Sequence, residues 1–227
     1  MKILFWDVDG TLLQTGHAGV FAIKDAFAEL NGNTLELNGF NAGGRTDNYI
    51  CQQLLYRASG KMPSEQEVDT FCRHYETLLV KYLEKAQGTV IPPVKDVLEF
   101  FHHRDDYVQL LLTGNSRYGA FLKLAHYGLQ GYFDFERSAF AENYYYRNDL
   151  ARNGLRIVRE TWGPAVEDIF VIGDTPFDIE CGKVIGAKTI AVATGSRSLE
   201  MLQACDPWWC VPQLPEPMVM WEKLEKS

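Results

Sequence analysis

The sequence has few of the features that mark secreted or membrane-spanning proteins. Its 227 residues include five cysteines, an odd number with no CxxC pair and no zinc-like cluster. We therefore predict a reduced, cytoplasmic protein without disulfides. The N-terminal apolar stretch reaches an acid at Asp7, too early for the apolar region of a signal peptide. No stretch approaches the roughly 20 apolar residues that a membrane-spanning helix needs.

Positive charge is also scarce. Lys and Arg total 22 against 30 Asp and Glu, which gives a formal net charge of −8 at pH 7. Proteins that bind nucleic acid or anionic membranes through their general surface need a basic surface. We therefore expect no nucleic acid and no membrane as partner, and a small molecule bound by a monomer or homodimer.

Apolar runs alternate with helical patterns along most of the chain. Residues 3–8, 107–112, 169–172 and 189–193 are typical of strands buried on both faces, 133–140 is a weaker candidate interrupted by charge, and 208–211 is strand-like. Helical spacing occurs at 94–101, 118–127, 150–161 and 178–185, with Phe121, Leu122 and Ala125 on the expected buried face of the second. This alternation predicts an α/β fold, a parallel sheet flanked by helices.

Residues 15–88 break the alternation, because they hold three helical patterns and no convincing strand. The first is marked by Val20, Ile23, Phe27 and Leu30, the second covers 47–58, and the third covers 64–85. Ser64 and Glu67 have the spacing of a capping box at the start of the third. We predict a helical domain at 15–88 inserted into a core domain of 1–14 and 89–227, with hinges near 13–17 and 87–93.

Acidic residues follow two of the expected strands. Asp7 and Asp9 stand in the segment Asp7-Val8-Asp9-Gly10-Thr11, and Asp174 and Asp178 stand in Gly173-Asp174-Thr175-Pro176-Phe177-Asp178. The carboxyl ends of parallel strands lie at one edge of a sheet, so these acids are expected to meet. Clustered carboxylates need a cation, and Mg2+ prefers oxygen ligands. A solvated turn at the first segment and a helix cap at Asp178 are the alternative interpretations.

Thr113-Gly114-Asn115 follows the strand expected at 107–112. A hydroxyl, a side-chain amide and free backbone N–H groups at a helix start can bind a phosphate. Combined with the acids, this segment favours phosphoryl transfer, which needs a cation to offset the phosphate charge.

The motifs DVDGT, LLTGN and VIGDTPFD resemble, in this order, the first, second and fourth motifs of the haloacid dehalogenase (HAD) superfamily. The resemblance is closest to phosphoglycolate phosphatase-like members, which carry a helical cap after the first motif. It implies a HAD-like Rossmann-type α/β core with an inserted α-helical cap. It also implies a Mg2+-dependent phosphatase that hydrolyses small phosphorylated metabolites, such as phosphoglycolate or a sugar phosphate, through an aspartyl-phosphate.

The resemblance also implies roles for single residues. Asp7 is similar to the nucleophile and Asp9 to the general acid/base. Asp7, Asp174 and the backbone carbonyl of Asp9 are similar to the metal ligands, and Asp178 to a supporting acid, bound through water or acting indirectly. Thr113, Gly114 and Asn115 are expected to hold the transferring phosphoryl group.

The third motif departs from the family pattern, which has a lysine before the helix expected at 150–161. No lysine lies between Lys123 and Lys183. Arg147 stands at the corresponding place and binds phosphate oxygens as a fork. Arg152 and Arg156 are its rivals, each alternatively a residue of a solvated helix face.

In the cap, Gly43-Gly44-Arg45-Thr46-Asp47 resembles the loop that recognises the leaving group. Arg45 and Thr46 are the expected substrate contacts, and an exposed turn with Thr46 as a helix cap is the alternative. Two other functions remain open, a sugar phosphomutase of the same superfamily and a non-catalytic domain that binds a phospho-ligand. A phosphomutase would release no phosphate, and a binding domain would turn over no phosphate ester.

Overall fold

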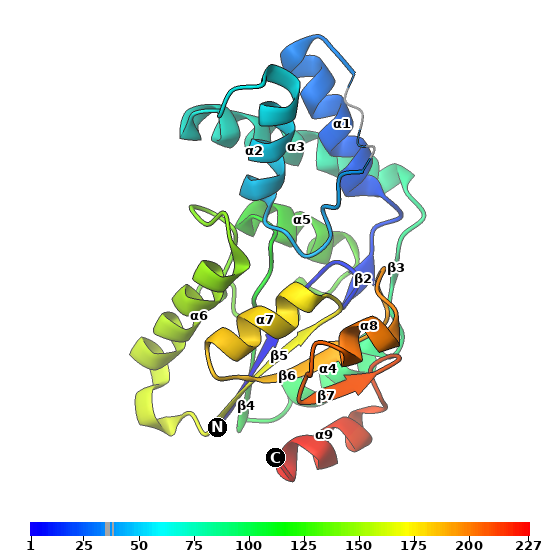
Figure 1. Cartoon of the computed structure of the whole chain (residues 1–227). Helices are drawn as coiled ribbons and strands as arrows, with labels where there is room; N and C mark the ends of the chain where they lie inside the picture. Colours follow the sequence, from blue (N-terminus) through cyan, green and yellow to red (C-terminus); the bar gives the residue numbers. More distant parts are fainter. Residues whose placement is uncertain (35–36, 38) are drawn as a thin grey trace.

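The protein is built around a five-stranded parallel sheet with the strand order β4-β1-β5-β6-β7 (Figure 1). The computed structural model describes residues 1–34, 37 and 39–227. The strands are β1 (Lys2–Trp6), β4 (Tyr107–Leu111), β5 (Asp168–Gly173), β6 (Lys188–Val192) and β7 (Trp209–Val211). The α/β fold class predicted from the alternation of strands and helices is confirmed.

Both faces of the sheet are covered by helices, which explains why most of the strand residues are apolar. Leu4 and Trp6 of β1 share a core with α4 (Val94–His102) and α9 (Pro217–Glu225). Ile3 and Phe5 point to the opposite face, toward α6 (Arg147–Trp162) and α7 (Pro176–Val184). Successive side chains of a strand alternate between faces, so a doubly covered strand has no polar side.

The strand predicted at 133–140 is wrong. After α5 (Arg117–His126) and a short 3-10 turn, η1 (Gln130–Tyr132), the segment runs irregularly beside β4, where Ala139 N donates to Leu111 O at 2.8 Å. Asp134 accepts hydrogen bonds from the backbone N–H groups of Glu136 and Arg137. These local side-chain bonds compete with a regular ladder of backbone hydrogen bonds.

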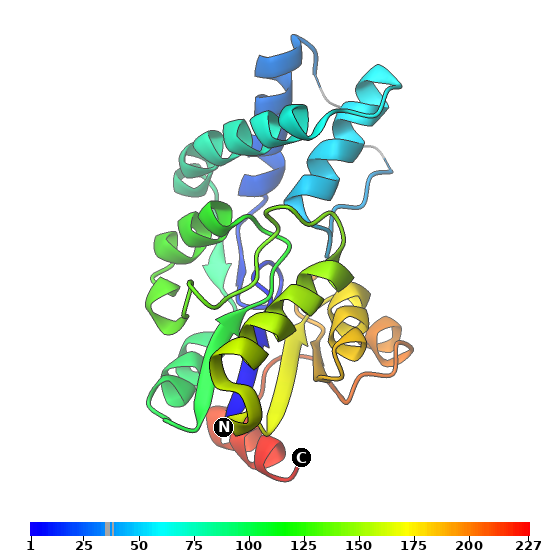
Figure 2. The same cartoon turned by 90° about the vertical axis from the view of Figure 1, so that its left-hand side faces the viewer.

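Three helices, α1 (Ala18–Asn31), α2 (Asp47–Ser59) and α3 (Glu65–Lys85), lie beyond the carboxyl ends of the strands (Figures 1 and 2). They share one apolar core and fall within the range 15–88 predicted for the cap. The capping box of Ser64 and Glu67 is confirmed.

The buried face of α1 differs from the expectation. Ile23 and Phe27 are buried, but Val20 is 41 % and Leu30 44 % exposed. Fully buried alanines take their place on the face that packs against α3, at positions 18, 22 and 26. Small side chains at four-residue spacing let two helices approach closely. Val20 therefore lies outside the core that α1 shares with α3.

The chain leaves and re-enters the core through two short strands, β2 (Leu13–Gln14) and β3 (Thr89–Val90), which pair in antiparallel register. They lie at the positions predicted as hinges. The remaining elements are α8 (Leu199–Gln203) and the 3-10 turn η2 (Gly163–Ala165). Among the helices of the described residues, none is long and apolar enough to cross a bilayer.

Candidate active site

Three acids from separate segments meet at the carboxyl edge of the sheet. Asp7 follows β1 and its backbone N–H donates to Ile172 O at 2.9 Å, which extends the parallel pairing with β5. Asp174 follows β5, and Asp178 lies in the first turn of α7. One carboxylate oxygen of each buried acid lies within 4.8 Å of the others. The acids that the sequence predicts to converge are thus brought together.

Arg147, the first residue of α6, is the cation beside these acids. Its Nη1 donates to Asp7 Oδ1 at 3.0 Å, and Nη2 donates to Asp178 Oδ1. The side chain is buried. The rivals Arg152 and Arg156 instead form exposed ion pairs within α6. Of the three arginines, only Arg147 reaches the site.

One guanidinium does not neutralise three buried carboxylates. Burial raises the pKa of Asp7 to about 7, with Arg147 opposing the rise and the charges of Asp178 and Asp9 adding to it. Burial raises the pKa of Asp174 to about 8, with Asp178 and Asp7 adding to that rise. The cluster therefore has a place for further positive charge.

The donor set fits a hard divalent cation. All three acids offer oxygen ligands, which Mg2+ prefers. A Cβ added at Gly195 would lie 1.7 Å from Asp174 Oδ2, and one at Gly10 would lie 2.5 Å from it, so both glycines make room for this carboxylate. Asp7 and Asp174 are the carboxylates available to such an ion.

Asp178 also caps the N-terminus of α7. Its Oδ2 accepts hydrogen bonds from Thr175 N at 3.0 Å and Thr175 Oγ1 at 2.6 Å, which forms the capping box of α7. Its Oδ1 is taken by Arg147. The helix-cap interpretation therefore holds for Asp178 together with its place in the acid cluster, and this suits a supporting acid rather than a direct ligand.

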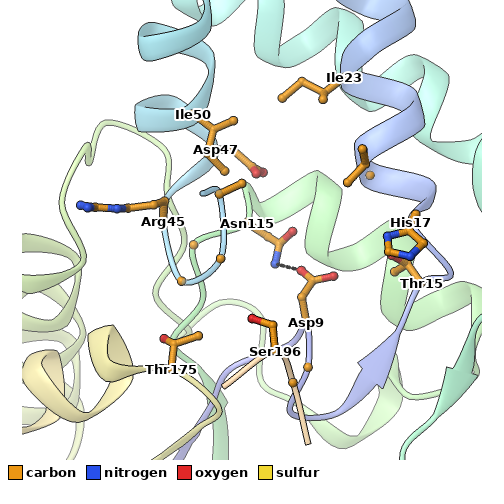
Figure 3. A pocket seen from close by; sticks show the side chains of 18 of the residues that line it. Asp9, Thr15, His17, Ile23, Arg45, Asp47, Ile50, Asn115, Thr175 and Ser196 are labelled. Carbon is orange, nitrogen blue, oxygen red and sulfur yellow. Dashed lines mark hydrogen bonds between the residues drawn. The ribbon is translucent and has the colours of Figure 1, made fainter. Parts of the chain in front are cut away.

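The Asp9 carboxylate lies apart from the three-acid cluster. Its Oδ2 accepts from Asn115 Nδ2 at 2.8 Å (Figure 3). The same oxygen accepts from Lys123 Nζ at 2.6 Å. Lys123 Nζ also donates to Asn115 Oδ1 at 2.6 Å. Asp9 is thus held by a cation and an amide, and only its backbone carbonyl remains for the metal role that the resemblance implies.

Lys123 was missed by the sequence analysis, which placed Phe121, Leu122 and Ala125 on the buried face of this helix. In α5 the buried residues are Gly119, Ala120, Lys123 and Leu124, and Phe121 is 44 % exposed. A buried lysine is tolerated because Asp9 and Asn115 accept its hydrogen bonds. The only available signal was its position, two helical turns after Asn115.

Two residues of the Thr113-Gly114-Asn115 segment line the cavity and the third does not. Asn115 and Gly114 line the cavity described below. Thr113 is fully buried, and its Oγ1 accepts from Asn115 Nδ2 at 2.8 Å. Thr113 therefore orients Asn115 and does not line the cavity, and its contact with the phosphoryl group stays a prediction.

Of the two residues expected to contact the substrate, Arg45 lines the cavity and Thr46 does not. The Arg45 guanidinium lies over the rings of Phe177 and Tyr49, with 4.2 and 4.7 Å to their centroids, and points away from Asp9 and Asn115 (Figure 3). Thr46 is fully buried; its Oγ1 accepts from Tyr49 N as the N-cap of α2 and donates to Tyr145 O. The helix-cap alternative is therefore the observed one.

The cap loop nevertheless contacts the core directly. Asp47 N donates to Gly114 O at 2.7 Å, and a Cβ at Gly114 would lie 2.2 Å from Arg45 O. Gly44 has φ +73°, and a Cβ there would lie 2.5 Å from Thr175 Oγ1. Glycine is required at these contacts because no side-chain atom fits.

A cavity of about 500 Å³ lies between the cap helices and the carboxyl edge of the sheet. Its floor includes Asp7, Asp9, Asn115, Lys123, Arg147 and Asp174. The family model for haloacid dehalogenase-like hydrolases matches residues 4–183. The chain belongs to this family.

Solved structures with the same fold cover nearly all of this haloacid dehalogenase-like hydrolase. A family IA, variant 3 HAD hydrolase from Entamoeba histolytica has a TM-score of 0.73 at 19 % identity, over 98 % of this chain and 100 % of that one. A predicted phosphoglycolate phosphatase from Haemophilus somnus has a TM-score of 0.72 at 16 % identity, over 98 % of each chain. A candidate beta-phosphoglucomutase from Bacteroides vulgatus has a TM-score of 0.71 at 19 % identity, over 100 % of this chain and 89 % of that one. No curated protein matches the sequence.

Proposed function

We propose that this haloacid dehalogenase-like hydrolase is a Mg2+-dependent phosphatase that cleaves monoesters of small phosphorylated metabolites through an aspartyl-phosphate on Asp7. The supporting observation is that the Asp7 carboxylate lies beside Arg147 and Asp174, while Asp9, two residues later, is held separately by Lys123 and Asn115. A nucleophile and a proton carrier thus stand in different electrostatic surroundings on the floor of one cavity.

In the first step, an Asp7 carboxylate oxygen attacks phosphorus and the bond from phosphorus to the leaving oxygen breaks. Asp9 gives its proton to that oxygen, so the alcohol leaves neutral. Arg147 orients Asp7 and offsets charge on the transferring group. The Asn115 amide and the Gly114 backbone hold phosphoryl oxygens at the start of α5.

In the second step, Asp9 takes a proton from water, whose oxygen attacks the phosphorus of the aspartyl-phosphate. The bond from phosphorus to Asp7 breaks, which releases inorganic phosphate and restores both acids. Mg2+ held by Asp7, Asp174 and the Asp9 carbonyl would neutralise the phosphoryl charge. The cap contacts at Gly114 keep bulk water out during the first step.

The test is release of inorganic phosphate from p-nitrophenyl phosphate with Mg2+ present. Asp7→Asn should lower kcat by at least about 1000-fold, because a nucleophile is lost, whereas Asp149→Asn on the exposed start of α6 should not. Hydroxylamine should trap an acyl phosphate in the wild type and none in Asp7→Asn. Full activity of Asp7→Asn, or isomerised sugar phosphate with no free phosphate, would contradict the proposal.

A further inference from the structure

The cavity above the candidate catalytic residues has a roof of different chemistry from its floor. Helices α1 and α2 and the segment between them contribute apolar side chains to the roof: Val20, Ile23, Leu37, Phe40, Ile50 and Leu54. Ile23 and Ile50 point into the space above Asp9 and Asn115 (Figure 3). Val20, one of the apolar residues that mark the first cap helix in the sequence, is partly exposed and lines this space.

Among the residues that the structure describes, the lysine and arginine side chains that line the cavity are those of Lys123 and Arg147, which are paired with acids, and Arg45, which lies over aromatic rings. Lys123 is bonded to Asp9 and Asn115, and Arg147 to Asp7 and Asp178. Arg45 lies over Phe177 and Tyr49. Residues 35, 36 and 38, outside that description, are Leu, Glu and Asn. Of the described cations of the lining, two are thus neutralised by acids, and the third is directed away from the space above Asp9 and Asn115 (Figure 3).

The roof also holds an acid. Asp47, at the start of α2, lines the cavity and accepts a hydrogen bond from Ser116 N at 2.9 Å. A carboxylate or second phosphate on the leaving group would lie in apolar surroundings near this acid, without a counter-charge, and burial of an unpaired charge is costly. An apolar leaving group would instead gain from burial against the roof.

We infer that the leaving group of the preferred substrate is a neutral, mainly apolar alcohol, alkyl or aryl, rather than a carboxylate-bearing or doubly phosphorylated one. This inference rests on the proposed phosphatase function and narrows its substrate class. The cavity volume leaves room for several carbon atoms beyond the phosphate.

A series of alkyl monophosphates tests the inference, because these alcohols have similar basicity. Ethyl, butyl and hexyl phosphate are compared with 2-phosphoglycolate and glucose 6-phosphate, with Mg2+ at pH 8. We expect kcat/KM to rise up to about fourfold per methylene, and hexyl phosphate to exceed phosphoglycolate. A flat series, or a preference for phosphoglycolate or glucose 6-phosphate, overturns the inference and leaves the phosphatase proposal standing. Turnover of none of the esters overturns both.

A matched pair of variants locates the selectivity in the roof. Val20→Arg places a cation in the cavity, and we expect it to lower the ratio of kcat/KM for hexyl phosphate over phosphoglycolate by tenfold or more. Val80→Arg is the control, because Val80 is 40 % exposed on α3, close to the 41 % of Val20, and does not line the cavity. The ratio of two substrates does not depend on how much of each variant is folded. An unchanged ratio in Val20→Arg overturns the inference.

Discussion

Lys123 Nζ lies 2.6 Å from Asp9 Oδ2, and both residues also bond to the side chain of Asn115. Lys123 belongs to α5, which follows β4, whereas Asp9 follows β1. The cation and the acid thus come from segments far apart in the sequence. Both bonds to Asp9 use the same oxygen, which fixes the orientation of the carboxylate above the cavity floor. Lys123 is a positioning residue for the proton carrier in the proposed reaction.

We predict that Lys123→Met lowers kcat by about 10- to 100-fold, the range expected when a hydrogen bond to a charged group is lost. It should leave the aspartyl-phosphate detectable by hydroxylamine, because Asp7 is not touched. It should also shift the pH profile of kcat, since the charge beside Asp9 changes. Lys95→Met, on the exposed start of α4, is the control. An unchanged kcat and pH profile would remove Lys123 from the mechanism.

The raised pKa values of Asp7, about 7, and Asp174, about 8, predict how stability of the metal-free protein depends on pH. Folded-state values above the ordinary 3.8 mean that the folded protein keeps protons that the unfolded chain has released. Stability from these protons is fully present below about pH 4 and is lost as pH rises through about 8. With a chelator present, Tm should therefore fall between pH 5 and 9.

Asp174→Asn should flatten that fall, whereas Asp149→Asn should not change it. Added Mg2+ should raise the Tm of the wild type more at pH 8 than at pH 6, because ligation requires the deprotonated acids. Most of this Mg2+ effect should vanish in Asp174→Asn. Equal pH slopes for the wild type and Asp174→Asn in chelator would contradict the assignment.

Gly43 and Gly44 in the cap loop allow a test of whether the contact between this loop and the core matters for activity. Gly44→Ala forces a side chain to φ +73° and against Thr175, whereas at Gly43 the nearest atom to an added Cβ is Asn41 Oδ1 at 3.4 Å. Backbone strain of this kind costs about 1–3 kcal/mol, and opening of the loop relieves it. We predict that Gly44→Ala lowers kcat/KM about tenfold and Gly43→Ala less than twofold. The reverse order in steady-state kinetics would refute a role for the loop contact.

The helix-cap role of Thr46 can be separated from the expected substrate contact by mutation. As an N-cap, Thr46→Ala should lower the free energy of unfolding by about 1 kcal/mol, measured by urea denaturation, and leave KM unchanged. Ser64→Ala removes the N-cap of α3 and should have a similar effect. A large rise in KM without loss of stability would restore Thr46 as a substrate contact.

The order of strands, helices and acidic motifs in the sequence was enough to predict the parallel sheet and the meeting of the acids at its edge. Apolar runs that end in Asp7, Thr113 and Asp174 had to become parallel strands, and parallel strands end at one edge. The resemblance to the family's third motif indicated Arg147 with Arg152 and Arg156 as rivals, and the structure places Arg147 beside Asp7. The failed strand at 133–140 shows the limit, because Asp134 and Ser138 form local bonds that no apolar pattern reveals.

The sequence by itself determined which segments meet, because that depends on strand periodicity and chain order. Only the tertiary structure decided which side chains of the helices point into the site, because the rotation of a helix is set by what it packs against. Alanines against α3 turned Val20 toward the cavity, and the pairing with Asp9 turned Lys123 inward. The Arg45 guanidinium lies over the ring of Phe177, which is likewise far away in the sequence, and it points away from Asp9 and Asn115.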